Sequence, residues 1–366
     1  MRGVEVRALA YAAPFSRNDE TLDEYAEKIS ANLRDAAKLL ESAFGRVRTL
    51  RIVFPYVDSL AETLDVRPEK VVETLYDAVS SSYNYLAFPL KDVGNLYLIR
   101  YILENFEKAF TSVPYNVDMS GNIAQMLTEV SSNLGYIAAA RLAVSFGQQL
   151  LTPYFPATTG GKEAVMMSLL YPKYLEDAIQ SGAELSATLE ALAQFSFKAL
   201  KRAVNSAELG VDALLIDYSL SPWLEASSAR VVEAVSGAKL GEPGTLGAIY
   251  EINKAIQRAA EKYFGGGFNE VMLPVAEDDR LKELVAEGAL KLRDIVSMVS
   301  TCVAGLDMVL LPADFSVEEL SRLMMDLYAL HKVKNRVIGM RVILTDMPPG
   351  FEAELGMFGR VPVAEI

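Results

Sequence analysis

Short apolar runs alternate with longer amphipathic stretches from one end of this sequence to the other. Two of the runs, VDALLIDYSLSP at 211–222 and VSTCVAGLDMVLLPAD at 299–314, meet Asp, Ser or Pro at their edges. Runs of this length and apolarity are typical of strands buried on both faces. Polar groups at the ends of such strands are where α/β enzymes place their chemistry. The pattern therefore predicts an α/β fold with functional side chains at strand ends.

The strand candidates are residues 3–11, 48–55, 82–88, 110–117, 144–151, 165–170, 211–218, 270–275, 306–312 and 339–345. Helical periodicity covers residues 20–43, a segment from Pro68, and residues 95–109, 122–143, 173–180, 183–206, 225–236, 245–262, 279–297 and 316–332. This alternation predicts a parallel sheet covered by helices. No linker-like break divides the chain, so we expect one α/β domain over residues 1–366.

Four of the strand candidates run into a proline, which cannot donate a hydrogen bond to the next strand. These residues are Pro55, Pro89, Pro274 and Pro312. Each proline marks a point where a strand leaves the sheet. We therefore expect the loops that follow these prolines to carry the functional site.

Composition and charge restrict the kind of partner. The formal net charge is −13, and an acidic surface disfavours nucleic acid. There is no apolar run of about 18 residues, so we expect no membrane span. The charges at Arg2, Glu5 and Arg7 interrupt the first apolar run, which argues against a signal peptide. A single cysteine allows no intrachain disulfide, so we expect a cytoplasmic protein. With nucleic acid and membrane disfavoured, we expect its partner to be a small molecule.

Three loops carry candidate ligand-binding side chains. In PATTGGKE (156–163), Thr159 and Lys162 could bind an anion, although the order is not that of a P-loop and a surface turn is the alternative. Asp217 and Ser219 follow a strand candidate, where a carboxylate binds a metal or a hydroxyl or takes a proton. Capping of the next helix is the alternative for both. Thr245 precedes a helix and either helps to bind an anion or acts as an N-cap.

Further candidates lie near the last three strand candidates. Glu277 and Asp278 follow the predicted strand at 270–275, and a solvated helix start is their alternative. The chain has one cysteine, Cys302, and one histidine, His331. Carboxylates without several Cys or His side chains favour Mg²⁺ or Mn²⁺ over zinc. Cys302 is a nucleophile only if a base lies near it, and burial in the core is the alternative.

Several segments together resemble the uncharacterised domain of unknown function family 711, also called uncharacterised protein family 0210. The matching segments are LIDYSLSP (215–222), GEPGTLGA (241–248), GGGFNEVMLPVAED (265–278), VSTCVAGLDMVLLPADF (299–315) and ELGMFGRVPV (354–363). The resemblance implies a single large α/β barrel of about ten strands, related to pyruvate formate-lyase, with its helices outside. It implies no established reaction.

Motif positions of that family correspond here to Asp217, Glu277, Asp278, Cys302, Asp307 and Arg341. Two histidines of the family pattern, near the segments that match TTGGKEA and GGGFNEV, are absent from this sequence. Any activity that depends on them in relatives is therefore lost or changed here.

The first hypothesis is an enzyme that binds a small polar or anionic metabolite inside the barrel. Asp217, Glu277 and Asp278 would hold a divalent metal or substrate hydroxyls, and Arg341 would pair with a carboxylate or phosphate. Cys302 would line the centre of the site. The alternative is a ligand-binding or regulatory protein on the same fold, which the missing histidines favour.

Two more hypotheses rest on short patterns. RVIGM at 336–340 is similar to a glycyl-radical signature around Gly339, with Met340 in place of the aromatic residue. Together with Cys302 it suggests radical chemistry as a remote alternative. A stripe on the helix predicted at 316–332 could pack on a second copy in a homo-oligomer, although core packing is the usual fate of such a stripe. Its members are Met324, Met325, Leu327 and Leu330.

Overall fold

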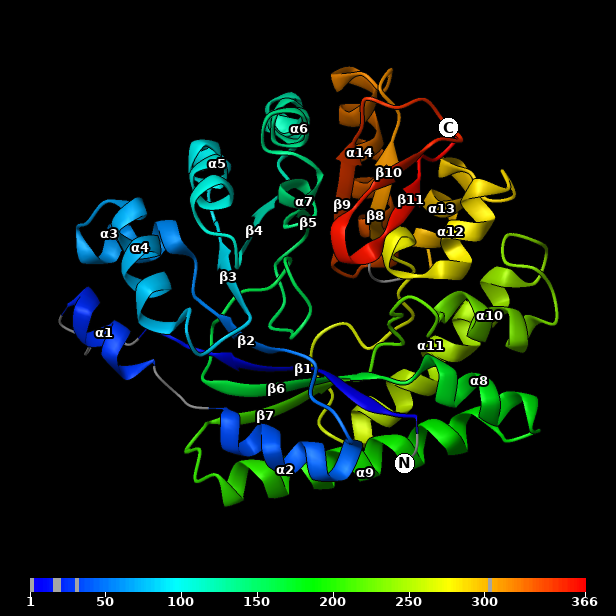
Figure 1. The fold of residues 1–366 in the computed structure, drawn as a ribbon, viewed down its shortest axis with the longest axis horizontal. Coiled ribbons are helices and arrows are strands. Elements are labelled where there is room, and N and C mark those ends of the chain that lie inside the picture. The colour runs from blue at the N-terminus through cyan, green and yellow to red at the C-terminus, as the bar shows by residue number, and fades with distance from the viewer. Residues whose placement is uncertain (1–2, 16–20, 30–32, 302–304) are drawn as a thin grey trace.

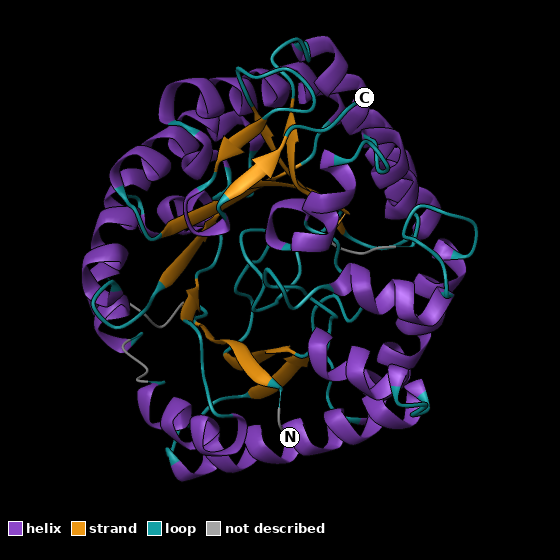
Figure 2. Cartoon of the chain, turned by 45° about the vertical axis from the view of Figure 1, so that its right-hand side comes forward, coloured by secondary structure: helices purple, strands orange, loops and turns teal. Residues whose placement is uncertain are grey.

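A large mixed sheet lies inside a shell of helices (Figures 1 and 2). The computed structural model describes residues 3–15, 21–29, 33–301 and 305–366. The strands are β1 (Glu5–Ala12), β2 (Leu50–Val53), β3 (Tyr85–Pro89), β4 (Ala109–Pro114), β5 (Leu142–Phe146), β6 (Ala164–Leu170), β7 (Ala213–Asp217), β8 (Gly305–Leu311) and β9 (Ile338–Leu344). A short hairpin of β10 (Glu352–Glu354) and β11 (Arg360–Pro362) follows. The predicted α/β class with helices outside is confirmed.

The sheet has nine strands in the order β7-β6-β1-β2-β3-β4-β5-β9-β8. Strands β1 to β5 are parallel to one another, but β6 is antiparallel to β1 and β9 is antiparallel to β5. The prediction of a parallel sheet is therefore wrong for two pairs of neighbouring strands, β6 with β1 and β9 with β5. Burial on both faces gives parallel and antiparallel strands the same apolar composition, so the composition could not reveal the direction. In the described residues, the edge strands β7 and β8 are not paired with each other in the sheet order.

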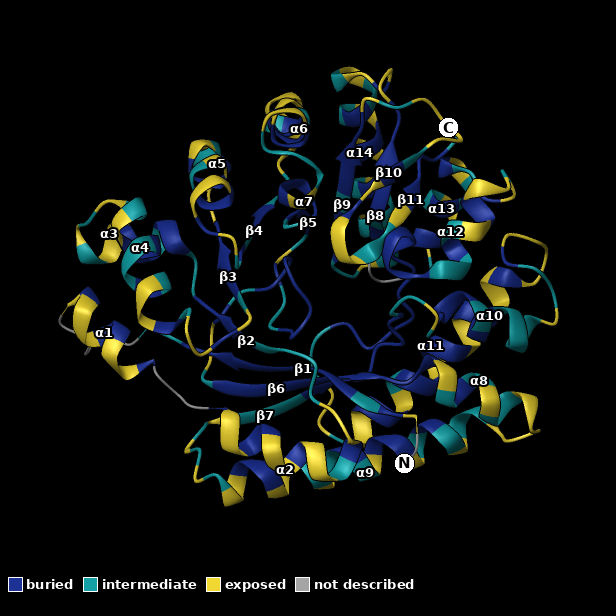
Figure 3. Cartoon of the chain, viewed as in Figure 1, coloured by how far each residue is buried: buried dark blue, intermediate teal, exposed yellow. Residues whose placement is uncertain are grey.

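The helices are α1 (Leu22–Lys28), α2 (Arg34–Phe44), α3 (Val57–Leu64), α4 (Pro68–Val79), α5 (Leu96–Asn105), α6 (Ser120–Glu129), α7 (Tyr136–Ala139), α8 (Pro172–Gln180), α9 (Leu185–Ser206), α10 (Ser228–Ser236), α11 (Thr245–Lys262), α12 (Asp279–Ala286), α13 (Leu292–Val299) and α14 (Val317–Lys334). Their exposed faces point outward and the strands beneath them are buried (Figure 3). No helix in the described ranges is long and apolar enough to cross a membrane.

Several predicted elements differ from the structure. The helical stretch predicted at 20–43 contains two helices, α1 and α2. The segment predicted as a strand at 270–275 forms only an isolated bridge from Val271 to Leu220 and then a 3₁₀ turn, Val275–Glu277. The helix predicted at 279–297 is two helices, because Gly288 adopts a positive φ of 67° between α12 and α13. The helix predicted at 122–143 ends early, in a π-helical turn at Val130–Leu134 that is followed by α7 and β5.

The apolar stripe on α14 packs mostly into the core. Met324 and Leu327 are fully buried, whereas Met325 is exposed. Core packing therefore explains most of the stripe that suggested contact with a second copy.

The two faces of β1 carry side chains of different size. Ala10 and Ala12 belong to a small inner cluster, whereas Leu9 and Tyr11 pack in the main core beneath the helices. The small inner side chains leave space for the inner loop (residues 147–163), whose Phe155 packs in the same inner cluster. Figure 2 shows loops occupying the space that the strands surround. The interior of the sheet is thus filled by chain segments and not only by strand side chains.

Two register shifts in the sheet occur at or beside charged side chains of the cavity described below, Arg7 and Asp307. The pairing of β1 with β6 shifts register between Val6 and Ala8, and Arg7 is the extra residue. The pairing of β8 with β9 shifts in the same way after Asp307, where Met308 has a positive φ of 54°. A bulge re-aims a side chain that regular alternation would send to the other face. Both bulged segments face the cavity described below.

Strands β8 and β9 approach each other closely at two glycines. Gly305 pairs with Gly339 and has a positive φ of 81°. A Cβ atom on Gly305 would lie 2.0 Å from the carbonyl oxygen of Gly339. This contact gives both glycines a role in packing.

We expect Gly305→Ala to lower the free energy of unfolding by about 2–5 kcal/mol, from the strained φ and the overlap with backbone. Gly45→Ala is the matched control, because Gly45 has a φ of 82° but open space around its Cα. The control should lose only about 1–2 kcal/mol. Urea unfolding of both variants measures the difference. Equal losses would contradict the close approach of β8 and β9.

Candidate functional site

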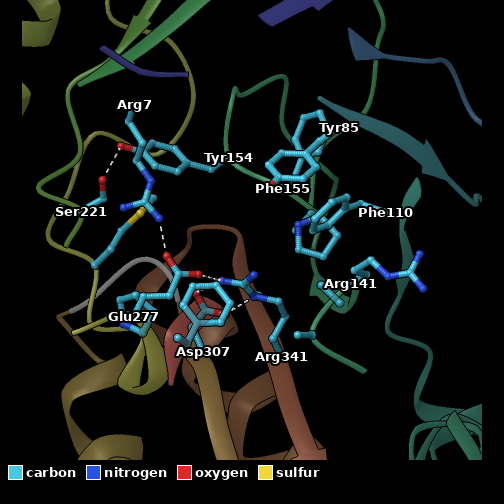
Figure 4. Close-up of a pocket in the computed structure, with 18 of the residues that line it drawn as sticks. Arg7, Tyr85, Phe110, Arg141, Tyr154, Phe155, Ser221, Glu277, Asp307 and Arg341 are labelled. Carbon is cyan, nitrogen blue, oxygen red and sulfur yellow. Dashed lines mark hydrogen bonds and ion pairs between the residues drawn. The ribbon is translucent and has the colours of Figure 1, made fainter. Parts of the chain in front are cut away.

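A cavity of about 410 Å³ opens inside the curved sheet (Figure 4). Consecutive parallel strands line it with residues near their amino-terminal ends: Arg7, Arg51, Tyr85, Phe110 and Ala143. Strands β8 and β9, the inner loop and the β10–β11 hairpin complete the wall. The cavity therefore combines side chains that are far apart in the sequence.

The expectation that loops after the strand-ending prolines carry the site holds at this cavity for one segment, the one after Pro274 that carries Glu277. The loops after the other three prolines do not line the cavity. Of the four prolines, all in described segments, Pro274 alone lines it. At the carboxyl end of β2 the inner loop fills the space, and the Gly160 N–H donates to the Phe54 carbonyl at 2.9 Å. A Cβ atom on Gly160 would already lie 3.1 Å from the backbone there. The open volume is left at the opposite end of the strands.

Four charged side chains form a continuous chain along one wall of the cavity, which we call the charged chain. Arg7 donates to Glu277, and Arg341 donates to the other oxygen of Glu277 at 2.8 Å. Arg341 also binds both oxygens of Asp307. Figure 4 shows Glu277 between the two guanidinium groups. Two positive and two negative charges alternate, so this chain is neutral by itself.

The arginines determine the charge state of Glu277. Glu277 is 4% exposed, and burial alone would raise the pKa of its carboxyl. The guanidinium groups of Arg7 and Arg341 outweigh burial and hold that pKa below its ordinary value. Glu277 is therefore a carboxylate at neutral pH and is not a ready proton donor.

Arg51 stands apart from the charged chain. It is only 9% exposed, and in the described part of the protein it forms no ion pair with a carboxylate. Its Nε donates to Thr49 Oγ1 and its Nη1 to the Pro153 carbonyl, both at 2.9 Å. No described group accepts a hydrogen bond from Nη2. Burial and then the neighbouring Arg7 lower the pKa of Arg51 to about 10, so it stays charged at pH 7.

Aromatic rings enclose the guanidinium of Arg51. Its Cζ lies 5.5 Å from the ring centroid of Tyr85 and 5.2 Å from that of Phe155. Phe110 contacts both rings edge to face, at centroid distances of 5.1 and 5.8 Å. Such rings favour a cation over their faces and also present apolar edges to the cavity. The wall around Arg51 is therefore aromatic.

The structure brings three sequence-predicted site residues together at the cavity: Glu277, Asp307 and Arg341. Asp217 and Ser219 are fully buried beside it and do not line it. Asp217 accepts hydrogen bonds from Ser219 Oγ at 2.6 Å and from Thr152 Oγ1 and the Phe268 N–H, both at 2.8 Å. These bonds tie the end of β7 to the inner loop and to the segment after Gly267.

The remaining candidates lie elsewhere. Asp278 caps α12 by accepting from the Arg280 N–H at 3.0 Å, and it also binds the Ala229 N–H. Thr245 accepts from the Gly241 N–H at 3.0 Å at the start of α11. Thr159 and Lys162 are on the inner loop but do not line the cavity, and Lys162 is exposed. Cys302 lies outside the described residues.

The described residues provide no obvious metal centre. They contain no group of three or more His, Cys, Asp or Glu side chains placed to hold a metal ion. The carboxylates that do face the charged chain, Glu277 and Asp307, are already bound by arginines. Both carboxylates are therefore arranged to bind arginine.

Sequence reasoning missed the residues that dominate the cavity. Arg7 and Arg51 each place a charge inside an apolar strand, in VEVRALA and RIVFP. A charged residue that interrupts a strand buried on both faces was the available signal. The aromatic residues Tyr85 and Phe110 carried no such signal, because aromatic side chains are common in any buried strand.

The fold and the cavity define an α/β protein with a buried charged chain facing a central cavity. A family profile described as "Uncharacterised ACR (DUF711)" matches residues 95–349, so the chain belongs to this family. A UPF0210 protein of Acetivibrio thermocellus is 26% identical over 368 residues, covering 90% of this chain and 81% of the relative. A UPF0210 protein of Pyrobaculum aerophilum is 26% identical over 383 residues, covering 94% and 84%. The family resemblance inferred from the sequence motifs is confirmed.

Solved structures with a similar course of the chain include an anaerobic ribonucleotide reductase. Its TM-score is 0.47 at 8% identity, covering 99% of this chain and 76% of that chain. The anaerobic ribonucleotide reductase of Thermotoga maritima in complex with dATP and CTP gives a TM-score of 0.45 at 8% identity, covering 92% and 77%. Likeness at this level gives no information on the chemistry of the cavity.

We expect Asp217→Asn to destabilise the protein by about 2–4 kcal/mol, because an amide cannot accept all the hydrogen bonds that the carboxylate accepts. Asp92→Asn is the matched control, since Asp92 is exposed and accepts from the Gly94 N–H at 2.8 Å. The control should change stability by less than about 1 kcal/mol. Urea unfolding tests both. A stable Asp217→Asn variant would contradict a structural role for Asp217.

Glu277→Gln should cost about 3–5 kcal/mol at pH 7, because it leaves Arg7 without a carboxylate partner. The folded-state pKa of Glu277 is lowered, so its stabilising effect is full above about pH 4.5 and is lost as pH falls through the folded value. The gap between parent and variant should therefore shrink below pH 4.5 in urea unfolding. Glu283→Gln, in a surface pair with a carboxylate 47% exposed, should cost under about 1 kcal/mol. A gap that does not depend on pH would refute the ion pairing.

Proposed function

We propose that this protein binds a small anionic molecule in the central cavity, with its negative charge at Arg51. The observation that carries the proposal is a buried guanidinium whose Nη2 has no acceptor, and which has no carboxylate partner, among the described residues. A buried charge without a counterion is costly, and proteins retain such a charge where a ligand neutralises it. The aromatic rings beside Arg51 keep water from neutralising it fully.

The charge balance of the whole cavity supports an anion. Its described lining contains four arginines, Arg7, Arg51, Arg141 and Arg341, and three carboxylates, Glu107, Glu277 and Asp307. One positive charge is therefore left over. The protein as a whole carries a net charge of −13, so a net positive cavity is a local departure from an acidic surface.

Binding, and not acid–base catalysis, is what the described lining supports. Glu277 and Asp307 are both engaged by arginines. Tyr154 donates to Ser221 Oγ at 2.9 Å, and burial raises the pKa of its hydroxyl far above neutrality. None of these three groups is available as a base near pH 7. We therefore propose a receptor or carrier role. If the protein converted a bound ligand to product, its role would also include catalysis.

Two arginine variants separate a functional from a structural role. Arg51→Met should leave the melting temperature unchanged or raise it, because it removes a buried charge that nothing described neutralises. Arg341→Met should lower the melting temperature strongly, by about 3–5 kcal/mol of stability, because it leaves the buried Asp307 without its arginine and leaves Glu277 with Arg7 alone. Differential scanning calorimetry of the unliganded protein compares the two.

The binding test uses the same Arg51→Met variant. Small organic anions should raise the melting temperature of the parent protein and leave that of Arg51→Met unchanged. Arg360→Met, a surface arginine paired with Glu352, is the control and should respond like the parent. Anions that stabilise the parent and Arg51→Met equally would contradict the proposed function.

A further inference from the structure

We infer that the ligand is an organic monocarboxylate with an apolar, ring-containing body, its carboxylate at Arg51 and its body against Phe110 and Phe155. The inference rests on the proposed function and narrows it to a chemical class. Four features support this class of ligand: the unpaired charge of Arg51, its nitrogen without an acceptor, the size of the cavity and the apolar side chains of its walls.

Charge and donors favour one negative charge on the ligand. The charged chain is neutral, and of the described arginines beside it Arg51 is the one that is buried without an ion pair. Two of the three guanidinium nitrogens of Arg51 are already used by Thr49 and Pro153. One free nitrogen suits one carboxylate oxygen, whereas a phosphate dianion would bring more charge and more acceptors than this wall satisfies.

Size excludes a bare inorganic ion as the main occupant. The cavity is about 410 Å³, and one water occupies roughly 30 Å³ in the liquid. A lone anion would leave most of this space to water against aromatic rings. Volumes of a few hundred Å³ are typical of sites for organic ligands. The ligand therefore has a body well beyond its charged group.

The walls determine what that body is. Phe110 and Phe155 meet edge to face beside Arg51. Near solvent, Ile137 and Met357 line the same cavity although they are 51% and 59% exposed. Apolar side chains thus continue from the buried cation to the mouth. Such a wall favours an apolar or ring-containing body over a sugar or a polyol.

Isothermal titration calorimetry with four probes tests this inference. The probes are 3-phenylpropanoate, propanoate, 3-phenylpropan-1-ol and phenyl phosphate, titrated into the parent protein and into Arg51→Met. We expect 3-phenylpropanoate to bind the parent at least tenfold more tightly than each other probe, and to lose at least tenfold in affinity for Arg51→Met. Phe110→Ala should weaken 3-phenylpropanoate about tenfold and leave propanoate unchanged. Phe351→Ala is the control, because Phe351 is exposed and does not line the cavity.

The outcomes separate the inference from the proposed function. If no probe distinguishes the parent from Arg51→Met, the proposed function itself is wrong. If binding depends on Arg51 but the phenyl group adds no affinity, the proposed function stands and the ring-containing body is refuted. Tighter binding of phenyl phosphate than of 3-phenylpropanoate would refute the single negative charge. Equal losses in Phe110→Ala and Phe351→Ala would refute the assigned wall.

Discussion

The structure depends on the buried carboxylate of Glu277 and the two guanidinium groups that share it. Arg7 comes from β1, the third strand in the sheet order, and Arg341 comes from β9, the eighth. Glu277 therefore connects two parts of the sheet across its interior. Removing Glu277 would leave Arg7 without a carboxylate, and removing Arg341 would leave Asp307 without an arginine; a buried charge without a partner costs several kcal/mol. This requirement fixes the segment that carries Glu277 and, with it, one wall of the cavity.

Because the charged chain is neutral, it cannot neutralise Arg51. If the charged chain had a surplus carboxylate, that carboxylate would neutralise Arg51 and the cavity would have no preference for a charged ligand. Because Arg7, Glu277, Arg341 and Asp307 cancel, Arg51 contributes the net positive charge at the buried end. The aromatic side chains around it lower the local polarity, which strengthens the attraction of an anion. In the function that we propose, fold stability and ligand preference are thus carried by different arginines in the same cavity.

Much of the fold could be predicted from the sequence, because buried strands and amphipathic helices leave strong patterns. The positions of β6, β7 and β8 follow from their apolar runs, and Glu277, Asp307 and Arg341 follow from motif positions. Strand direction could not be predicted, since β6 and β9 are buried like their parallel neighbours. Asp217 looked like a site residue because a buried carboxylate that accepts several hydrogen bonds has the same sequence signature as a catalytic one.

The location of the site could not be predicted for a different reason. Arg7 is the extra residue of a register shift between β1 and β6, and such a bulge leaves little trace in one sequence. The inner loop occupies the carboxyl ends of the strands, where α/β sites usually lie, and moves the open volume to the other end. This placement depends on packing between Gly160 and Phe54, which are far apart in the chain.

The central claim is that Arg51 carries a charge that an anion, and not the protein, neutralises. Crystals of the protein soaked in sodium bromide test it directly, because the anomalous signal locates bromide among other atoms. We expect a bromide peak within hydrogen-bonding distance of Arg51 Nη2. In Arg51→Met crystals, we expect no bromide peak at that place. Density for a protein carboxylate paired with Arg51, and no bromide beside it, would contradict the account.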